Sequence, residues 1–121
     1  MMKNHEDYKL NINEKHHIEK VDKPSGTAIK LANDIIKNSN YSSWILDGNT
    51  TKNDINIDSF REGNEKCFHE IKYTSKNDEI TISHNAKNRF SFALGSVLSA
   101  EYIIGKKGIF TINDVINNIK I

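Results

Sequence analysis

One short segment of the sequence carries two adjacent histidines, a lysine and a serine-glycine-threonine turn. It reads Glu14-Lys15-His16-His17-Ile18-Glu19-Lys20-Val21-Asp22-Lys23-Pro24-Ser25-Gly26-Thr27-Ala28. A helix that begins at this turn presents unpaired backbone N–H groups and a partial positive charge, so Gly26 and Thr27 can hold a carboxylate or phosphate. Lys20 adds a full charge, and a histidine such as His16 can pass a proton near neutral pH. The segment therefore indicates a site for a small anionic substrate with proton-transfer chemistry.

Two other interpretations of the segment stay open at the level of residue types. Ser25 can be a simple helix N-cap, with both histidines solvated and without a catalytic role. Zinc binding is the weaker alternative, because adjacent histidines in a strand point to opposite faces and no cysteine or further histidine lies at ligand spacing. The sequence therefore predicts no metal site.

The elements that would position this segment follow from hydrophobic periodicity. Apolar residues alternate with polar ones from Tyr8 to Ile12, which predicts a strand that runs into the two histidines. Helical spacing of apolar residues predicts one amphipathic helix over residues 26–38. Residues 41–54 are rich in Asn, Ser and Thr, so we expect a long loop there, with Trp44 as its anchor.

The second half of the chain contains three strand patterns and two helix patterns. The strands are expected near residues 54–62, 67–73 and 79–84, and their order predicts an antiparallel meander with hairpin connections. Residues 89–104 leave little polar surface, which predicts a helix that is buried on most sides. A short helix should follow Thr111. The element order predicts an α+β fold, with a mixed, mostly antiparallel sheet and helices packed on one face.

Length and composition exclude several classes of protein. A chain of 121 residues is expected to form one domain, and 17 basic against 16 acidic side chains do not favour a nucleic-acid partner. No apolar segment is long enough for a membrane span or a secretory signal, so a cytoplasmic location is expected. The single cysteine, Cys67, cannot form an internal disulfide and is interpreted as a small apolar side chain in a strand.

The segment from Glu14 to Ala28 resembles the E-x-H-H-x-x-K-x-D-x-P-S-G-T-A signature of dihydrodipicolinate reductase, the bacterial lysine-pathway family now described as 4-hydroxy-tetrahydrodipicolinate reductase. The resemblance continues in order along nearly the whole chain. Further matching stretches are Arg61-Glu62-Gly63 followed by His69, the strand from Glu79 to Ala86, Arg89 with Phe92-Ala93-Leu94-Gly95, and Gly108 to Val115.

The resemblance implies that residues 1–121 are the C-terminal substrate-binding and oligomerisation domain of a two-domain Rossmann-type reductase. The family's N-terminal domain, which binds NADH or NADPH, is absent from this chain, and the glycines form no phosphate loop between a strand and a helix. The first residues, Met1 to Tyr8, are similar to the end of the family's inter-domain helix. A homotetramer is implied as the assembly.

The resemblance also implies roles for five residues. His16 matches the family's proton donor and acceptor, and Lys20 matches a second catalytic position, a proton donor. His17 matches a substrate contact. Gly26 and Thr27 match the turn whose backbone holds a carboxylate of the small dianionic dicarboxylate substrate. The implied reaction is the NAD(P)H-dependent conversion of 4-hydroxy-tetrahydrodipicolinate to tetrahydrodipicolinate.

The sequence departs from the family pattern at two places. Lys23 replaces a small residue and is expected to add positive potential near the substrate, and Lys66-Cys67 replaces a small turn. His69 and His84 fall on apolar strand faces, so we expect both to be core histidines that are hydrogen-bonded inside the sheet or an interface. Arg89 receives no role in the site.

A different class of function remains as the alternative. The chain can be a noncatalytic small-anion-binding or assembly module with the same fold, while a metal-dependent hydrolase has little support from ligand spacing. An upstream reading frame that encodes a glycine-rich nucleotide loop would favour the enzyme, whereas a true start at Met1 would favour the module.

Overall fold

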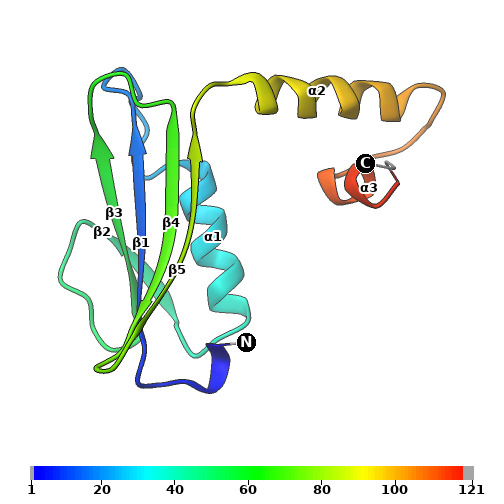
Figure 1. The fold of residues 1–121 in the computed structure, drawn as a ribbon. Helices are drawn as coiled ribbons and strands as arrows, with labels where there is room; N and C mark the ends of the chain where they lie inside the picture. The colour runs from blue at the N-terminus through cyan, green and yellow to red at the C-terminus, as the bar shows by residue number, and fades with distance from the viewer. Residues whose placement is uncertain (1, 119–121) are drawn as a thin grey trace. The chain divides into compact units, whose positions relative to one another are not determined.

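The computed structural model describes residues 2–118, which form two compact units (Figure 1). The first unit ends at Lys87 and the second begins at Asn88. No helix in the described part of the chain combines the length and the apolar character needed to cross a membrane.

The first unit consists of one sheet and one long helix. Its strands are β1 (Lys9–His16), β2 (Ser43–Leu46), β3 (Asp54–Arg61), β4 (Cys67–Thr74) and β5 (Glu79–Ala86), and its helix is α1 (Gly26–Lys37). The first residues, expected to continue an inter-domain helix, form instead a short 3-10 helix, η1 (Met2–Asn4), and Met1 lies outside the described residues.

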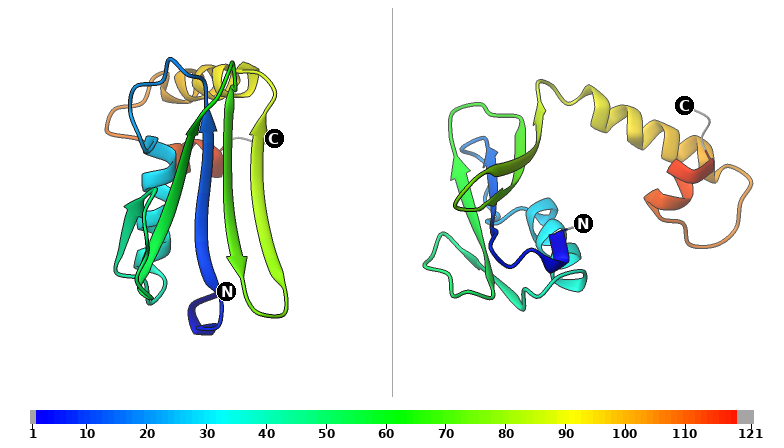
Figure 2. Two further views of the ribbon diagram at one scale, coloured as in Figure 1. Left: turned by 90° about the vertical axis from the view of Figure 1, so that its left-hand side faces the viewer. Right: turned by 60° about the horizontal axis from the view of Figure 1, so that its bottom comes forward.

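β1 and α1 form the centre of the first unit because each buries one face against the other. Every second residue of β1 is buried, as the alternation predicted, and α1 covers that face of the sheet (Figures 1 and 2). Complete burial of one isoleucine contributes about 1.5–3 kcal/mol. The buried apolar core consists of Leu10, Ile12, Ala28, Ala32, Ile55 and Ile57.

The sheet has the strand order β2-β3-β1-β4-β5 (Figure 2, left). β1 pairs in parallel with β3 and antiparallel with β4, so the α+β fold with a mixed sheet is confirmed. The predicted meander is wrong, because β1 lies between β3 and β4, and only β4 and β5 form the expected hairpin. The helical crossover after β1 places a later strand, β3, in parallel beside it.

The predicted loop over residues 41–54 contains the short strand β2, so that prediction is corrected. β2 pairs in parallel with β3, and Trp44 packs against the core as expected of an anchor. Four residues are too few to display the alternation of a strand among polar neighbours. To place β3 parallel to β2, the connection 47–53 must run back along the length of β2. It can be short because β2 itself has only a few residues.

The second unit consists of α2 (Phe90–Ile103) and α3 (Ile112–Asn118). α2 was expected to be buried on most sides, and this is wrong for the single chain, since none of its described side chains is buried. Phe90 is 72% exposed and Val97 is 53% exposed. Apolar side chains are spread around the helix rather than gathered on one face, and the described part of its unit supplies α3 and the connecting segment to cover it.

Candidate functional site

The carboxylate of Glu14 is buried and lies at the centre of a network of polar contacts. Glu14 continues the buried face of β1 and its exposed fraction is 0%. Its carboxylate accepts hydrogen bonds from the backbone N–H of Ser25 at 3.0 Å and from Ser59 Oγ at 2.5 Å. Burial raises the pKa of Glu14, but the contacts with His69, Ser25 and Ser59 outweigh it and hold the pKa well below its usual range. Glu14 is therefore a fixed negative charge inside the unit.

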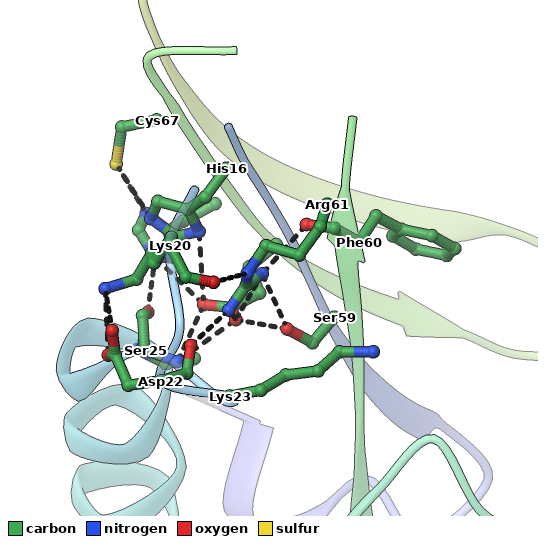
Figure 3. A network of polar contacts seen from close by, with 12 residues as sticks. His16, Lys20, Asp22, Lys23, Ser25, Ser59, Phe60, Arg61 and Cys67 are labelled. Atoms are coloured by element: carbon green, nitrogen blue, oxygen red, sulfur yellow. Dashed lines mark hydrogen bonds and ion pairs between the residues drawn. The ribbon is translucent and has the colours of Figure 1, made fainter. Parts of the chain in front are cut away.

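Arg61 at the end of β3 pairs with this charge and fastens the 17–25 loop. Its guanidinium lies 3.4 Å from Glu14 Oε1, and the side chain is largely buried. Arg61 also donates to two backbone carbonyls of the loop, that of Lys20 at 3.2 Å and that of Asp22 at 2.5 Å (Figure 3). The loop between β1 and α1 is thus held by one planar group with several donors, which a lysine could not replace.

His16, Cys67 and His69 form a cluster beside Glu14. The antiparallel register pairs Glu14 with His69 and Lys15 with Phe68, so the ends of β1 and β4 bring His16 and Cys67 together. Cys67 Sγ lies 3.6 Å from His16 Nε2 (Figure 3) and 3.3 Å from His69 Nδ1. The statement that no cysteine or further histidine lies at ligand spacing is therefore wrong, because strand pairing supplies the proximity that sequence spacing lacks.

His16 is buried rather than solvated, with an exposed fraction of 7%. Burial lowers the pKa of His16; Glu14 raises it, and His69, Arg61 and Lys20 lower it further, so the net shift is downward. This environment contradicts the interpretation of a plain helix cap with solvated histidines at His16. His17 follows β1 directly and is half-buried.

The two lysines of the loop have different surroundings. Lys20 lies close enough to act on the pKa of His16, and its ammonium pairs with both carboxylate oxygens of Asp22 at 2.7 and 2.8 Å. Lys23 extends away from His16 (Figure 3) and pairs with Asp47 at 2.7 Å. Each lysine is thus paired with an aspartate, which offsets the extra positive potential expected from Lys23, and the two differ in that Lys20 lies near His16.

The N-terminus of α1 completes the site. Ser25 is the N-cap, as predicted, and its hydroxyl accepts from the Ala28 N–H at 3.2 Å. Gly26 and Thr27 are exposed and open the helix, where backbone N–H groups have no acceptor within the helix itself. A methyl group built on Gly26 meets no atom within 4 Å, so the space in front of this helix end is open to a ligand.

Sequence reasoning missed several members of the network. Glu14 could have been found, because it continues the even-numbered, apolar face of β1 and a carboxylate there must be paired. Ser59 and Arg61 could have been found in the same way, because they continue the alternate positions of β3 that carry its buried isoleucines. The contacts of Cys67, in contrast, depend on the pairing register of β1 and β4, which local sequence patterns do not reveal.

The predictions for the remaining polar residues had mixed outcomes. His69 is a buried histidine, 3.0 Å from Ser25 Oγ, as expected. His84 is exposed in the single chain, on the edge strand β5 whose residues are mostly exposed, so it is not a core histidine of this sheet. Arg89 is the N-cap residue of α2 and makes no side-chain cap.

Comparison with known proteins places this chain in one family. Residues 1–116 match the family model described as "Dihydrodipicolinate reductase, C-terminus". The chain belongs to that family. It is 46% identical over 120 residues to the 4-hydroxy-tetrahydrodipicolinate reductase of Christiangramia forsetii, covering 98% of this chain and 50% of the relative. Identity to the Clostridium novyi reductase is 38% over 120 residues, covering 94% of this chain and 48% of that protein.

A solved structure supports the same assignment. The dipicolinate-bound dihydrodipicolinate reductase from Paenisporosarcina sp. TG-14 aligns with a TM-score of 0.64 and 26% identity, over 84% of this chain and 42% of that one. The chain therefore spans about half the length of the relatives it matches. The likeness in fold thus extends over 84% of the chain.

Proposed function

We propose that the chain is the substrate-binding and catalytic half of an NAD(P)H-dependent oxidoreductase that converts 4-hydroxy-tetrahydrodipicolinate to tetrahydrodipicolinate in lysine (diaminopimelate) biosynthesis. One observation carries the proposal. The open N-terminus of α1 at Gly26 lies at the end of the same loop whose start supplies His16 and Lys20, and Arg61 fixes that loop onto Glu14. An anion site and proton-carrying groups thus share one rigid segment.

The helix end would bind one carboxylate of a dicarboxylate substrate. Backbone N–H groups at Gly26 and Thr27 supply donors, and the partial positive charge of the helix terminus favours an anion. Lys20 and His17 would contact the same small molecule from the loop. Dipicolinate bound to the Paenisporosarcina reductase supports a dicarboxylate as the ligand class.

His16 and Lys20 would manage protons and developing charge. The His16 imidazole can deliver or accept a proton through a ring nitrogen, and the Lys20 ammonium can stabilise negative charge and donate a proton. Glu14 lies beside His16, with its Oε2 3.8 Å from His16 Nδ1, and its negative charge favours the protonated imidazole. Arg61 acts as a positioning residue, because it holds the loop and not the substrate.

The residues of this chain do not fit a dinucleotide. The strand-loop-helix unit from β1 to α1 contains a single glycine, Gly26, where a nucleotide-binding loop needs several to admit a pyrophosphate. We therefore assign NADH or NADPH mainly to another domain of the complete enzyme, and the cofactor bound there would supply the hydride. A cytoplasmic location is part of the proposal and depends on the biosynthetic role alone.

The complete enzyme is proposed to be a homotetramer. Exposed apolar side chains on α2 and the long edge strand β5 are the features that support self-association, since contiguous apolar surface marks interaction sites.

A domain chimera tests the proposed activity. The corresponding half of the Christiangramia forsetii reductase is replaced by this chain, and steady-state kinetics are measured with both cofactors. We expect reductase activity, with kcat about 10²- to 10⁴-fold lower in His16→Ala, because proton delivery is needed in the transition state. Lys20→Ala should lower kcat and also weaken substrate binding, since it removes a charged donor.

Two outcomes would separate the alternatives. A His16→Ala chimera with near wild-type kcat would remove His16 from the mechanism. A folded chimera that binds dipicolinate but has no activity would support the noncatalytic anion-binding module. The unmodified Christiangramia forsetii enzyme serves as the control for folding and assay.

A further inference from the structure

We propose that His16, Cys67 and His69 form a binding site for a zinc-type divalent cation, with Glu14 as its outer-shell carboxylate. The three side chains come from the adjacent strands β1 and β4, and one ligand atom of each lies within 4.8 Å of the others. The argument for this site depends on ligand geometry and not on the proposed reductase activity, although both use His16.

The spacing of the ligand atoms fits a tetrahedral centre. Zinc–sulfur bonds of about 2.3 Å and zinc–nitrogen bonds of about 2.0–2.1 Å separate sulfur and nitrogen by roughly 3.5 Å at a tetrahedral angle. Cys67 Sγ lies 3.6 Å from His16 Nε2 and 3.3 Å from His69 Nδ1. Two edges of the tetrahedron therefore exist already, and the third, between the two histidine nitrogens, is within 4.8 Å.

In each of the two imidazoles, the ring nitrogen that would not bind the cation lies near the carboxylate of Glu14. His69 Nε2 lies 3.5 Å from Glu14 Oε2 and His16 Nδ1 lies 3.8 Å from the same oxygen. His16 Nδ1 is buried and has no hydrogen-bond partner. Metal-binding histidines characteristically donate their second N–H to such a carboxylate, which fixes the ring and its tautomer. A small shift of the His16 ring toward Glu14 would supply the missing bond.

The donor types select the metal. One thiolate and two imidazoles favour zinc over magnesium or calcium, which prefer oxygen ligands. Binding transfers the thiol proton to solvent, and three protein ligands leave the fourth position for water or a ligand carboxylate. The cation would occupy His16 Nε2, so metal binding and proton transfer at that nitrogen exclude one another.

The test uses the full 121-residue chain, reduced and free of metal. Zinc affinity is measured by competition with a chromophoric chelator, and cobalt(II) is added separately to record thiolate-to-metal charge transfer and tetrahedral d–d bands. We expect one zinc ion per chain and a cobalt spectrum that contains both features. Cys67→Ser should weaken zinc binding by more than about 100-fold, beyond the roughly 10- to 100-fold cost of losing an outer-shell partner.

His5→Ala is the matched control, because it removes an exposed histidine outside the cluster and should leave zinc affinity unchanged. Equal zinc affinity in the wild-type chain and Cys67→Ser would overturn the proposal. A cobalt complex of the wild-type chain without thiolate charge transfer would overturn it as well, and that measurement does not depend on the folding of any variant.

Discussion

Glu14 shows how one buried charge can organise a loop. The carboxylate is inaccessible to solvent, so its cost of burial must be offset by specific partners. Ser25 and Ser59 donate hydrogen bonds to it, and Arg61 adds the opposite charge. These contacts link the end of β1 to the start of α1 and to β3. The position of the proposed catalytic loop therefore depends on a residue that need not touch the substrate.

Glu14→Gln is expected to destabilise the first unit by about 1.5–3 kcal/mol, because an amide cannot accept all these donors or balance Arg61. Urea unfolding followed by the fluorescence of Trp44, the single tryptophan, measures the change. Glu62→Gln is the control, since its pair with Lys15 at 3.8 Å is exposed and worth less than about 1 kcal/mol. Equal effects of both variants would contradict the central role of Glu14.

The substitution Gly26→Ala is expected to weaken ligand binding without disturbing the fold. A methyl group there meets no atom within 4 Å, and the backbone does not have a positive φ, so the fold should keep or slightly gain stability. The methyl group would instead occupy the space of the bound carboxylate. We expect dipicolinate affinity, measured by calorimetry on the chain, to fall about 10-fold or more, which is about 1.4 kcal/mol.

Gly95→Ala in α2 is the matched control, since its added methyl group also meets no atom within 4 Å and lies outside the site. Unchanged dipicolinate affinity in Gly26→Ala would remove this helix end from the carboxylate site.

At the scale of elements, Asp47 joins three segments of the first unit. It follows β2, accepts the Ser59 N–H of β3 at 2.9 Å and pairs with Lys23 of the 17–25 loop. The bond from Lys23, followed by that from Ser59, lowers the pKa of Asp47. A lowered pKa in the folded state adds stability above the unfolded value of about 3.9, and this stability is lost as pH falls through the folded value.

Asp47→Asn should therefore be less stable than the wild-type chain at pH 6, by up to about 1 kcal/mol for this partly exposed pair. The difference should shrink as pH falls below the unfolded value of about 3.9 and through the lowered pKa of folded Asp47, because the wild-type carboxylate then becomes protonated. Urea unfolding at a series of pH values gives both numbers. A stability difference that does not vary with pH would show that the Asp47 charge has no part in holding the loop.

The elements also show which features the sequence could predict. β1 and α1 were predicted well, because burial of one face leaves a period of two or of 3.6 in the residues themselves. β2 was missed since four residues carry no period, and the place of β1 between β3 and β4 was missed since pairing is a long-range property. His16 could be predicted as a site residue because the residues that mark the site are its neighbours in the sequence. Its contact with Cys67 could not be predicted, because that contact depends on long-range strand pairing.

At the scale of the whole chain, the distribution of apolar surface is uneven. The first unit encloses a core between α1 and the sheet, whereas the second leaves large side chains of α2 in contact with solvent. The edge strand β5 adds an exposed isoleucine, Ile82, and unpaired backbone groups. Surface of this kind is typical of an interface between subunits.

The isolated chain is therefore expected to self-associate at micromolar concentration, with a sedimentation mass above the 13.8 kDa of the monomer. Val97→Asp should raise the dissociation constant about 10-fold or more, because a carboxylate on α2 must be desolvated in any interface that covers the helix. Asn77→Asp, in the exposed turn between β4 and β5, introduces the same charge and should leave the mass unchanged. A soluble monomer of the wild-type chain at these concentrations would contradict the proposed assembly, and equal effects of the two variants would exclude α2 from its interface.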